Sequence, residues 1–154
     1  MSLQKTFYLL KEAESQAGEL YAMIGLSVSI SHPGLSGMFN ELSRDEQLHS
    51  RQIELMQNLF LQSQDAFLEN PETERTIAEF MQNLEMTRNY FNQHQAAIQP
   101  HDLIGLAIDL EQNLIEKHRT FFLAATDPQI KSLLESLNLA DAEHIKKLHD
   151  FPLD

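Results

Sequence analysis

Apolar residues recur along four stretches of the chain at alternating spacings of three and four, which places them on one face of an α-helix. These stretches cover residues 7–28, 35–60, 104–125 and 130–151. Prolines stand where helices are expected to begin or end, at Pro33, Pro71, Pro100 and Pro128. Alternating β-branched residues, which are typical of half-buried strands, are nearly lacking. The pattern therefore predicts an all-α protein.

The connections between these stretches predict their packing. The first two stretches are joined by a short connection, and so are the last two, so each pair is expected to form an antiparallel hairpin of a four-helix bundle. Residues 62–101 form a long crossover between the hairpins, in which Ile77, Phe80, Met81, Leu84 and Phe91 keep helical spacing and predict an extra helix. The length of 154 residues suits a single domain, 1–154.

Each of the four apolar faces is interrupted near its middle by ionisable residues. The first and third faces each carry one glutamate, and the second and fourth each carry an acid followed three residues later by a histidine. The six residues are Glu14, Glu46, His49, Glu111, Asp141 and His144. Glu14 precedes Glu46 by 32 residues and Glu111 precedes Asp141 by 30, so the two halves of the chain resemble each other.

These six residues predict a metal site in the core of the bundle. A buried carboxylate costs several kcal/mol unless it is paired or bound to a cation. The i, i+3 spacing puts each acid and its histidine on one helix face, so the set offers four carboxylates and two imidazoles. Two divalent ions would offset the four charges. Such ligands favour iron or manganese, and zinc would also bind in vitro.

Composition narrows the function further. The formal net charge is −12, which argues against binding to nucleic acid or to an anionic membrane, because both need clustered Lys and Arg. Cysteine is absent, which excludes disulfides, thiolate zinc sites, iron–sulfur clusters and a cysteine nucleophile. No apolar stretch reaches the 18 residues or so that span a bilayer, and no targeting segment is visible. A cytoplasmic protein is expected.

One glutamate from each of two helices and an acid-x-x-His from each of two others resembles the ligand set of ferritin-like di-iron proteins. The motifs are Glu14-x-x-Ala17-x-x-x-Tyr21, Glu46-Gln47-Leu48-His49, Ala107-Ile108-Asp109-Leu110-Glu111 and Leu139-Ala140-Asp141-Ala142-Glu143-His144. The chain is similar to rubrerythrin-type members of this superfamily that lack a rubredoxin domain. The resemblance implies a ferritin-like bundle with two iron ions held by the six residues.

Three departures from the rubrerythrin pattern matter. The second acid-x-x-His motif begins with Asp141, whose side chain is one methylene shorter than that of glutamate. Rubrerythrins that reduce peroxide have a further glutamate one turn after the third-helix glutamate, where this chain has Leu114. Because the chain has no cysteine for a rubredoxin-type iron, reducing electrons would have to come from a separate donor.

Other polar residues near the predicted site have less certain roles. Tyr21 lies on the same face as Glu14, either as a hydrogen-bond donor to a ligand carboxylate or as a core aromatic residue. His118 occupies the equivalent place in the third stretch and is expected to be a core or outer histidine rather than a ligand. Acids off the apolar faces, including Asp45 and Glu143, are expected to be solvated.

The predicted function is that of a non-haem di-iron oxidoreductase that reduces O2 or H2O2 and works as a homodimer. Iron would supply the redox chemistry and the helices its geometry. Two alternatives remain open. One is an iron-binding protein of the storage type, in which the same residues form a ferroxidase site, and the other is a helical interaction module with a vestigial metal site.

Overall fold

The computed structural model of the protein describes residues 3–62 and 71–153. They form five helices and no β-strand: α1 (Leu3–Ser27), α2 (Pro33–Gln62), α3 (Pro71–His94), α4 (Pro100–Ala124) and α5 (Pro128–Asp150). The predicted all-α class is confirmed. Residues 63–70 of the predicted crossover lie outside the described residues.

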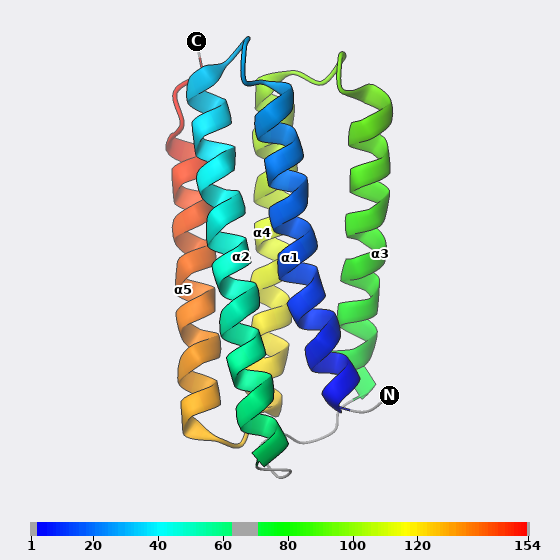
Figure 1. Cartoon of the computed structure of the whole chain (residues 1–154), viewed down its shortest axis with the longest axis vertical. Helices are drawn as coiled ribbons and strands as arrows, with labels where there is room; N and C mark the ends of the chain where they lie inside the picture. Colours follow the sequence, from blue (N-terminus) through cyan, green and yellow to red (C-terminus); the bar gives the residue numbers. More distant parts are fainter. Residues whose placement is uncertain (1–2, 63–70, 154) are drawn as a thin grey trace.

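Helices α1, α2, α4 and α5 lie side by side as a bundle (Figure 1). The chain runs in one direction along α1 and α5 and in the opposite direction along α2 and α4. Because α2 and α4 run the same way, the chain has to travel back along the whole bundle between them, and α3 makes this return beside α1 and α4. The extra helix expected in the crossover is therefore present, and it buries Ile77, Phe80, Leu84 and Phe91.

The helices begin where the prolines predicted. Pro33, Pro71, Pro100 and Pro128 each occupy the first position of a helix, where the missing N–H breaks no hydrogen bond and the fixed φ suits the helix. At the start of α5, the Asp127 carboxylate accepts hydrogen bonds from the backbone N–H groups of Gln129 and Ile130, at 2.8 and 3.2 Å. Local sequence thus sets the start of each helix after α1.

Apolar layers close the bundle above and below its middle. On one side, the rings of Phe7 on α1 and Phe121 on α4 meet edge to face with centroids 5.9 Å apart. On the other side, Tyr21 on α1 packs against Phe39 on α2, also at 5.9 Å. All four side chains are buried. Polar groups between these layers are therefore kept away from bulk water.

Polar contacts hold α2 against α1 next to the middle layer. The Ser43 hydroxyl donates to the backbone carbonyl of Gly18 at 2.7 Å, and the Gln47 amide donates to that of Ser15 at 3.0 Å. A Cβ atom at Gly18 would lie 2.8 Å from the Gln47 amide nitrogen and 3.1 Å from the Ser43 carbonyl oxygen, so glycine permits this close approach. These contacts fix the rotation of α2 that points Glu46 into the bundle.

In the described part of the chain, no helix has both the length and the hydrophobicity needed to cross a bilayer.

Candidate metal centre

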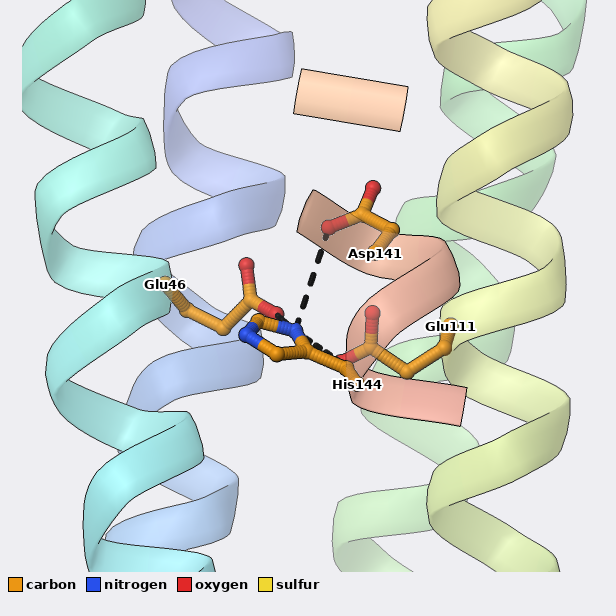
Figure 2. A group of neighbouring side chains, drawn as sticks. All are labelled: Glu46, Glu111, Asp141 and His144. Atoms are coloured by element: carbon orange, nitrogen blue, oxygen red, sulfur yellow. Dashed lines mark ion pairs between the residues drawn. The ribbon is translucent and has the colours of Figure 1, made fainter. Parts of the chain in front are cut away.

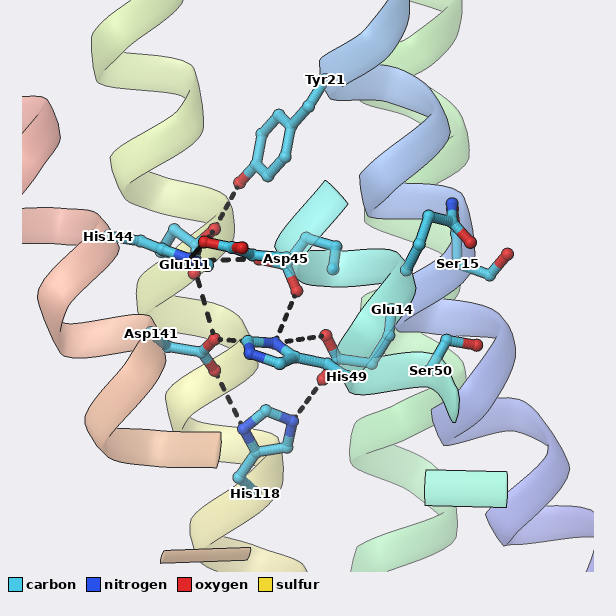
Figure 3. Close-up of polar contacts among 12 residues, drawn as sticks. Glu14, Ser15, Tyr21, Asp45, His49, Ser50, Glu111, His118, Asp141 and His144 are labelled. Carbon is cyan, nitrogen blue, oxygen red and sulfur yellow. Dashed lines mark hydrogen bonds and ion pairs between the residues drawn. The ribbon is translucent and has the colours of Figure 1, made fainter. Parts of the chain in front are cut away.

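The structure brings all six predicted ligand residues together in the middle of the bundle (Figure 3). They come from α1, α2, α4 and α5, and none is more than 5 % exposed. These side chains are therefore core residues and not partly solvated acids on the helix surfaces.

The first group of ligand atoms comes from Glu46, Glu111, Asp141 and His144, all within 4.8 Å of one another (Figure 2). His144 Nδ1 lies 3.2 Å from Glu46 Oε1, 3.3 Å from Glu111 Oε1 and 4.0 Å from Asp141 Oδ1. One imidazole nitrogen and three carboxylates from three helices thus converge on one place. This is a donor set for a divalent metal ion.

The second group consists of Glu14, Glu46 and His49. His49 Nδ1 lies 3.0 Å from Glu46 Oε2, 3.7 Å from Glu14 Oε2 and 3.5 Å from Asp141 Oδ1. Glu46 belongs to both groups, since its Oε1 faces His144 and its Oε2 faces His49. A carboxylate that presents one oxygen to each of two imidazoles has the arrangement of a bridge between two metal positions.

A third group joins Glu14 and Asp141 to His118. The His118 ring is 0 % exposed and lies between the two carboxylates (Figure 3). Its Nε2 contacts Glu14 Oε1, and its Nδ1 lies 2.9 Å from Asp141 Oδ2. His118 is thus buried in the core as expected, but it lies inside the cluster, in direct contact with two of the predicted ligands.

Burial and charge shift the pKa values of Glu14 and Glu46 in opposite directions. Burial and the neighbouring charges of Glu111 and Glu14 raise the pKa of Glu46 well above its usual range. Burial also disfavours the charged form of Glu14, but the charge of His118 and its hydrogen bond outweigh this effect and hold the pKa of Glu14 well below its usual range. Two equally buried glutamates therefore have very different pKa values in the metal-free protein.

The neighbouring carboxylates also raise the pKa values of His118 and His144. Burial alone would lower the pKa of His118, but the charges of Glu14 and Asp141 raise it to about 10. Burial is likewise outweighed at His144, where contacts with Glu111 and Asp45 raise the pKa to about 9. Burial raises the pKa of Asp141 to about 6, and the nearby His118 limits this rise. The metal-free centre therefore binds protons where cations would otherwise lie.

Several buried polar atoms of the centre have no hydrogen-bond partner. Among the described residues they include both carboxylate oxygens of Asp141, one oxygen each of Glu14, Glu46 and Glu111, and Nδ1 of His118 and of His144. Unsatisfied buried polar atoms are rare and costly in proteins. So many in one layer fit a site that is completed by cations, and these groups could hold metal.

Tyr21 and Asp45 contact the predicted ligands from outside the centre. The Tyr21 hydroxyl donates to Glu111 Oε1 at 2.9 Å, which matches the first of the two roles considered for it. Asp45 is solvated as expected, with its side chain 39 % exposed, but its Oδ2 also accepts a hydrogen bond from His144 Nε2 at 3.0 Å, which was not predicted. This contact leaves His144 Nδ1 facing the carboxylates.

The structure also explains why sequence reasoning missed Asp45. Asp45 directly precedes Glu46 and so points about 100° away from it around α2. This direction leads to the edge of the neighbouring α5, where Asp45 contacts His144 while its side chain stays partly exposed. Glu143, by contrast, is exposed as expected.

Comparisons of the chain with protein-family models, with curated proteins and with solved structures find no match. The functional argument therefore depends on the side chains of the centre and on the bundle that holds them. An all-helical bundle with buried carboxylate and histidine groups that could bind metal is compatible with a ferritin-like fold.

Proposed function

We propose that the protein is a rubrerythrin-type, ferritin-like oxidoreductase that binds two iron ions in the bundle core and reduces O2 or H2O2. The observation that carries this proposal is the position of Glu46, whose two oxygens face His49 and His144 at 3.0 and 3.2 Å. Two imidazoles on either side of one carboxylate favour a dinuclear site over a mononuclear one. Manganese would also suit these ligands.

Each metal position would have its own nitrogen and its own terminal carboxylate. His144 and Glu111 would serve one position, and His49 and Glu14 the other, with Glu46 between them. Asp141 lies near both imidazoles, 3.5 Å from the Nδ1 of His49 and 4.0 Å from that of His144. Four carboxylates would then offset the charge of two divalent ions, which makes burial of the whole set tolerable.

The surrounding side chains would keep the centre ordered and dry. Asp45 holds the His144 ring with Nδ1 toward the carboxylates, and Tyr21 holds Glu111 through its hydroxyl. Such outer contacts orient ligands and tune a metal. Leu42, Leu114 and Leu137 are fully or almost fully buried and limit the access of water. When bound, two Fe(II) ions would supply the electrons for reducing the oxidant, and a separate donor would then have to restore them.

Rapid oxidation kinetics test this proposal. The protein, loaded anaerobically with two equivalents of Fe(II), is mixed with O2 or H2O2 in a stopped-flow instrument. We expect iron oxidation that saturates at two Fe per chain and is much faster than that of free Fe(II). Glu46→Gln should abolish this phase, whereas Glu143→Gln, which changes an exposed acid beside His144, should not. Equal rates with and without protein would contradict the proposal.

The same sample separates the oxidoreductase from the storage alternative. An oxidoreductase retains two irons, is expected to elute as a dimer and returns to Fe(II) with an added reductant. A storage protein continues to take up iron far beyond two per chain and elutes as a large shell. A protein that binds no iron would favour the interaction module.

A further inference from the structure

The two halves of the chain supply corresponding residues to the centre, and one corresponding pair differs in kind. Tyr21 lies seven residues after Glu14 on α1, and its hydroxyl donates to Glu111 on α4. His118 lies seven residues after Glu111 on α4, and its Nε2 contacts Glu14 on α1. A phenol in one half of the centre is thus replaced by an imidazole in the other.

This replacement changes the chemistry available to the centre. A tyrosine hydroxyl offers one polar atom, whereas an imidazole offers two nitrogens. In the neutral ring one of these nitrogens carries a lone pair that can bind a metal ion. Both nitrogens of His118 face carboxylates, since Nε2 contacts Glu14 Oε1 and Nδ1 lies 2.9 Å from Asp141 Oδ2. His118 therefore brings a nitrogen donor to a place where Tyr21 brings none.

Each carboxylate beside His118 uses one oxygen to face His118 and the other to face His49. Glu14 turns Oε2 toward His49 and Oε1 toward His118, and Asp141 turns Oδ1 toward His49 and Oδ2 toward His118. Glu46 is shared in the same way between His49 and His144. Each of the three shared carboxylates thus presents separate oxygens to two different imidazoles.

Buried atoms without partners lie where the third imidazole meets these carboxylates. His118 Nδ1 and both oxygens of Asp141 are buried without a hydrogen-bond partner among the described residues, although Nδ1 and Oδ2 are close enough for an ion pair. The ring is 0 % exposed, so water does not satisfy Nδ1 from outside. A fully buried imidazole whose Nε2 contacts Glu14 and whose Nδ1 lies against Asp141, beside Asp141 oxygens that accept no hydrogen bond, indicates a place for a cation.

We propose that Glu14, His118 and Asp141 form a third divalent-cation position beside the two positions of the proposed dinuclear site, with His118 as its nitrogen ligand. The inference rests on the proposed function, because Glu14 and Asp141 also belong to the dinuclear site. One nitrogen and two carboxylates suit Zn(II), and Fe(II) or Co(II) would also bind.

The third position should fill last. Two divalent ions already offset the four carboxylate charges of Glu14, Glu46, Glu111 and Asp141, so a third ion brings excess positive charge into a buried site. A tight pair of ions and a weaker third ion are therefore expected. Zn(II) is the suitable probe, because it has no redox chemistry and its binding is measured apart from any reaction with oxygen.

The test is a count of bound Zn(II) in the chelator-treated, dialysed protein, by native mass spectrometry and by elemental analysis after gel filtration in zinc-containing buffer. We expect three ions per chain in the parent protein and two in His118→Phe. His149→Phe is the matched control, since it removes an exposed histidine in the last turn of α5, outside the centre, and it should keep three. His118→Gln, which is polar and smaller, gives the answer if His118→Phe does not fold.

The outcomes separate the two proposals. A parent protein that saturates at two ions, or a third ion that survives in both His118 variants, overturns the His118 position and leaves the dinuclear site intact. A parent protein that binds fewer than two ions contradicts the proposed function itself. Loss of the third ion in the His118 variants and not in His149→Phe supports the inference.

Discussion

Glu14 and Glu46 are both fully buried at the same level of the bundle, yet their neutralisation should change the stability of the metal-free protein in opposite directions. Glutamine has nearly the same shape as glutamate and no charge, so Glu14→Gln and Glu46→Gln change charge with little change in packing. The two variants therefore compare electrostatic surroundings rather than side-chain volume.

The structure indicates whether each variant raises or lowers the free energy of unfolding. Glu14 contacts His118, and this contact holds the pKa of Glu14 well below its usual range. Glu14→Gln leaves His118 buried with Asp141 as its remaining carboxylate contact, and breaking a buried ion pair costs about 3–5 kcal/mol. The pKa of Glu46 is raised by burial and by Glu111 and Glu14. Glu46→Gln removes a disfavoured charge, so stability should stay the same or rise.

The assay is urea unfolding followed by circular dichroism at pH 7.5 with a chelator present. Glu14→Gln should lose about 3 kcal/mol or more relative to Glu46→Gln. For a domain of this size a loss of 3 kcal/mol corresponds to a melting temperature lower by about 6–12 °C. Equal losses in both variants would refute this account, and so would a loss of 3 kcal/mol in Glu46→Gln alone.

Four further predictions concern pH, metal and oxidant. The pKa values of His118 and His144 rise from 6.5 to about 10 and about 9 on folding, so the folded metal-free protein binds more protons than the unfolded chain. The stability that these two groups contribute is full below pH 6.5 and is lost as the pH rises through their folded pKa values of about 9 and about 10. Urea titrations should show a fall of about 2 kcal/mol per pH unit near pH 7.5, and a flat profile would contradict this expectation. Asp45→Ala should weaken Fe(II) binding about 10–100-fold in a chelator competition, because His144 loses the hydrogen-bond partner of its Nε2. An unchanged affinity would show that this contact does not contribute to metal binding. Fe(II) should raise the melting temperature of the parent protein and not that of Glu46→Gln, because metal binds mainly the folded form. Because Leu114 stands in place of a further acid, stopped-flow oxidation of the Fe(II)-loaded protein should show no strong preference for H2O2 over O2. A rate with H2O2 about 100-fold higher than with O2, which corresponds to an activation barrier lower by about 2.7 kcal/mol, would contradict this expectation.

The arrangement within each helix could be predicted from the sequence because it depends on local periodicity. Residues three and four apart share a helix face, so the apolar spacing placed Glu14, Glu46, Glu111 and Asp141 among buried neighbours, and all four are buried. The prolines marked where helices begin because proline suits only the first turn. The extra helix followed from the spacing of Ile77 through Phe91.

The contacts between helices could not be predicted in the same way. Helical periodicity gives the direction of a side chain around its own axis, but not the rotation and offset of one helix against the next. Asp45 contacts His144 because α2 lies beside α5 at this level, and His118 reaches both Glu14 and Asp141 because three helices converge there. Both contacts depend on how the helices pack against one another, and this packing cannot be read from the periodicity of a single sequence.

The most direct test of the central claim is anomalous diffraction at the iron edge from crystals loaded anaerobically with two equivalents of Fe(II). The account predicts two peaks about 3.5–4 Å apart, one beside His144 and Glu111 and the other beside His49 and Glu14, with the Glu46 carboxylate between them. A single peak, or iron bound only at the surface of the bundle, would contradict it.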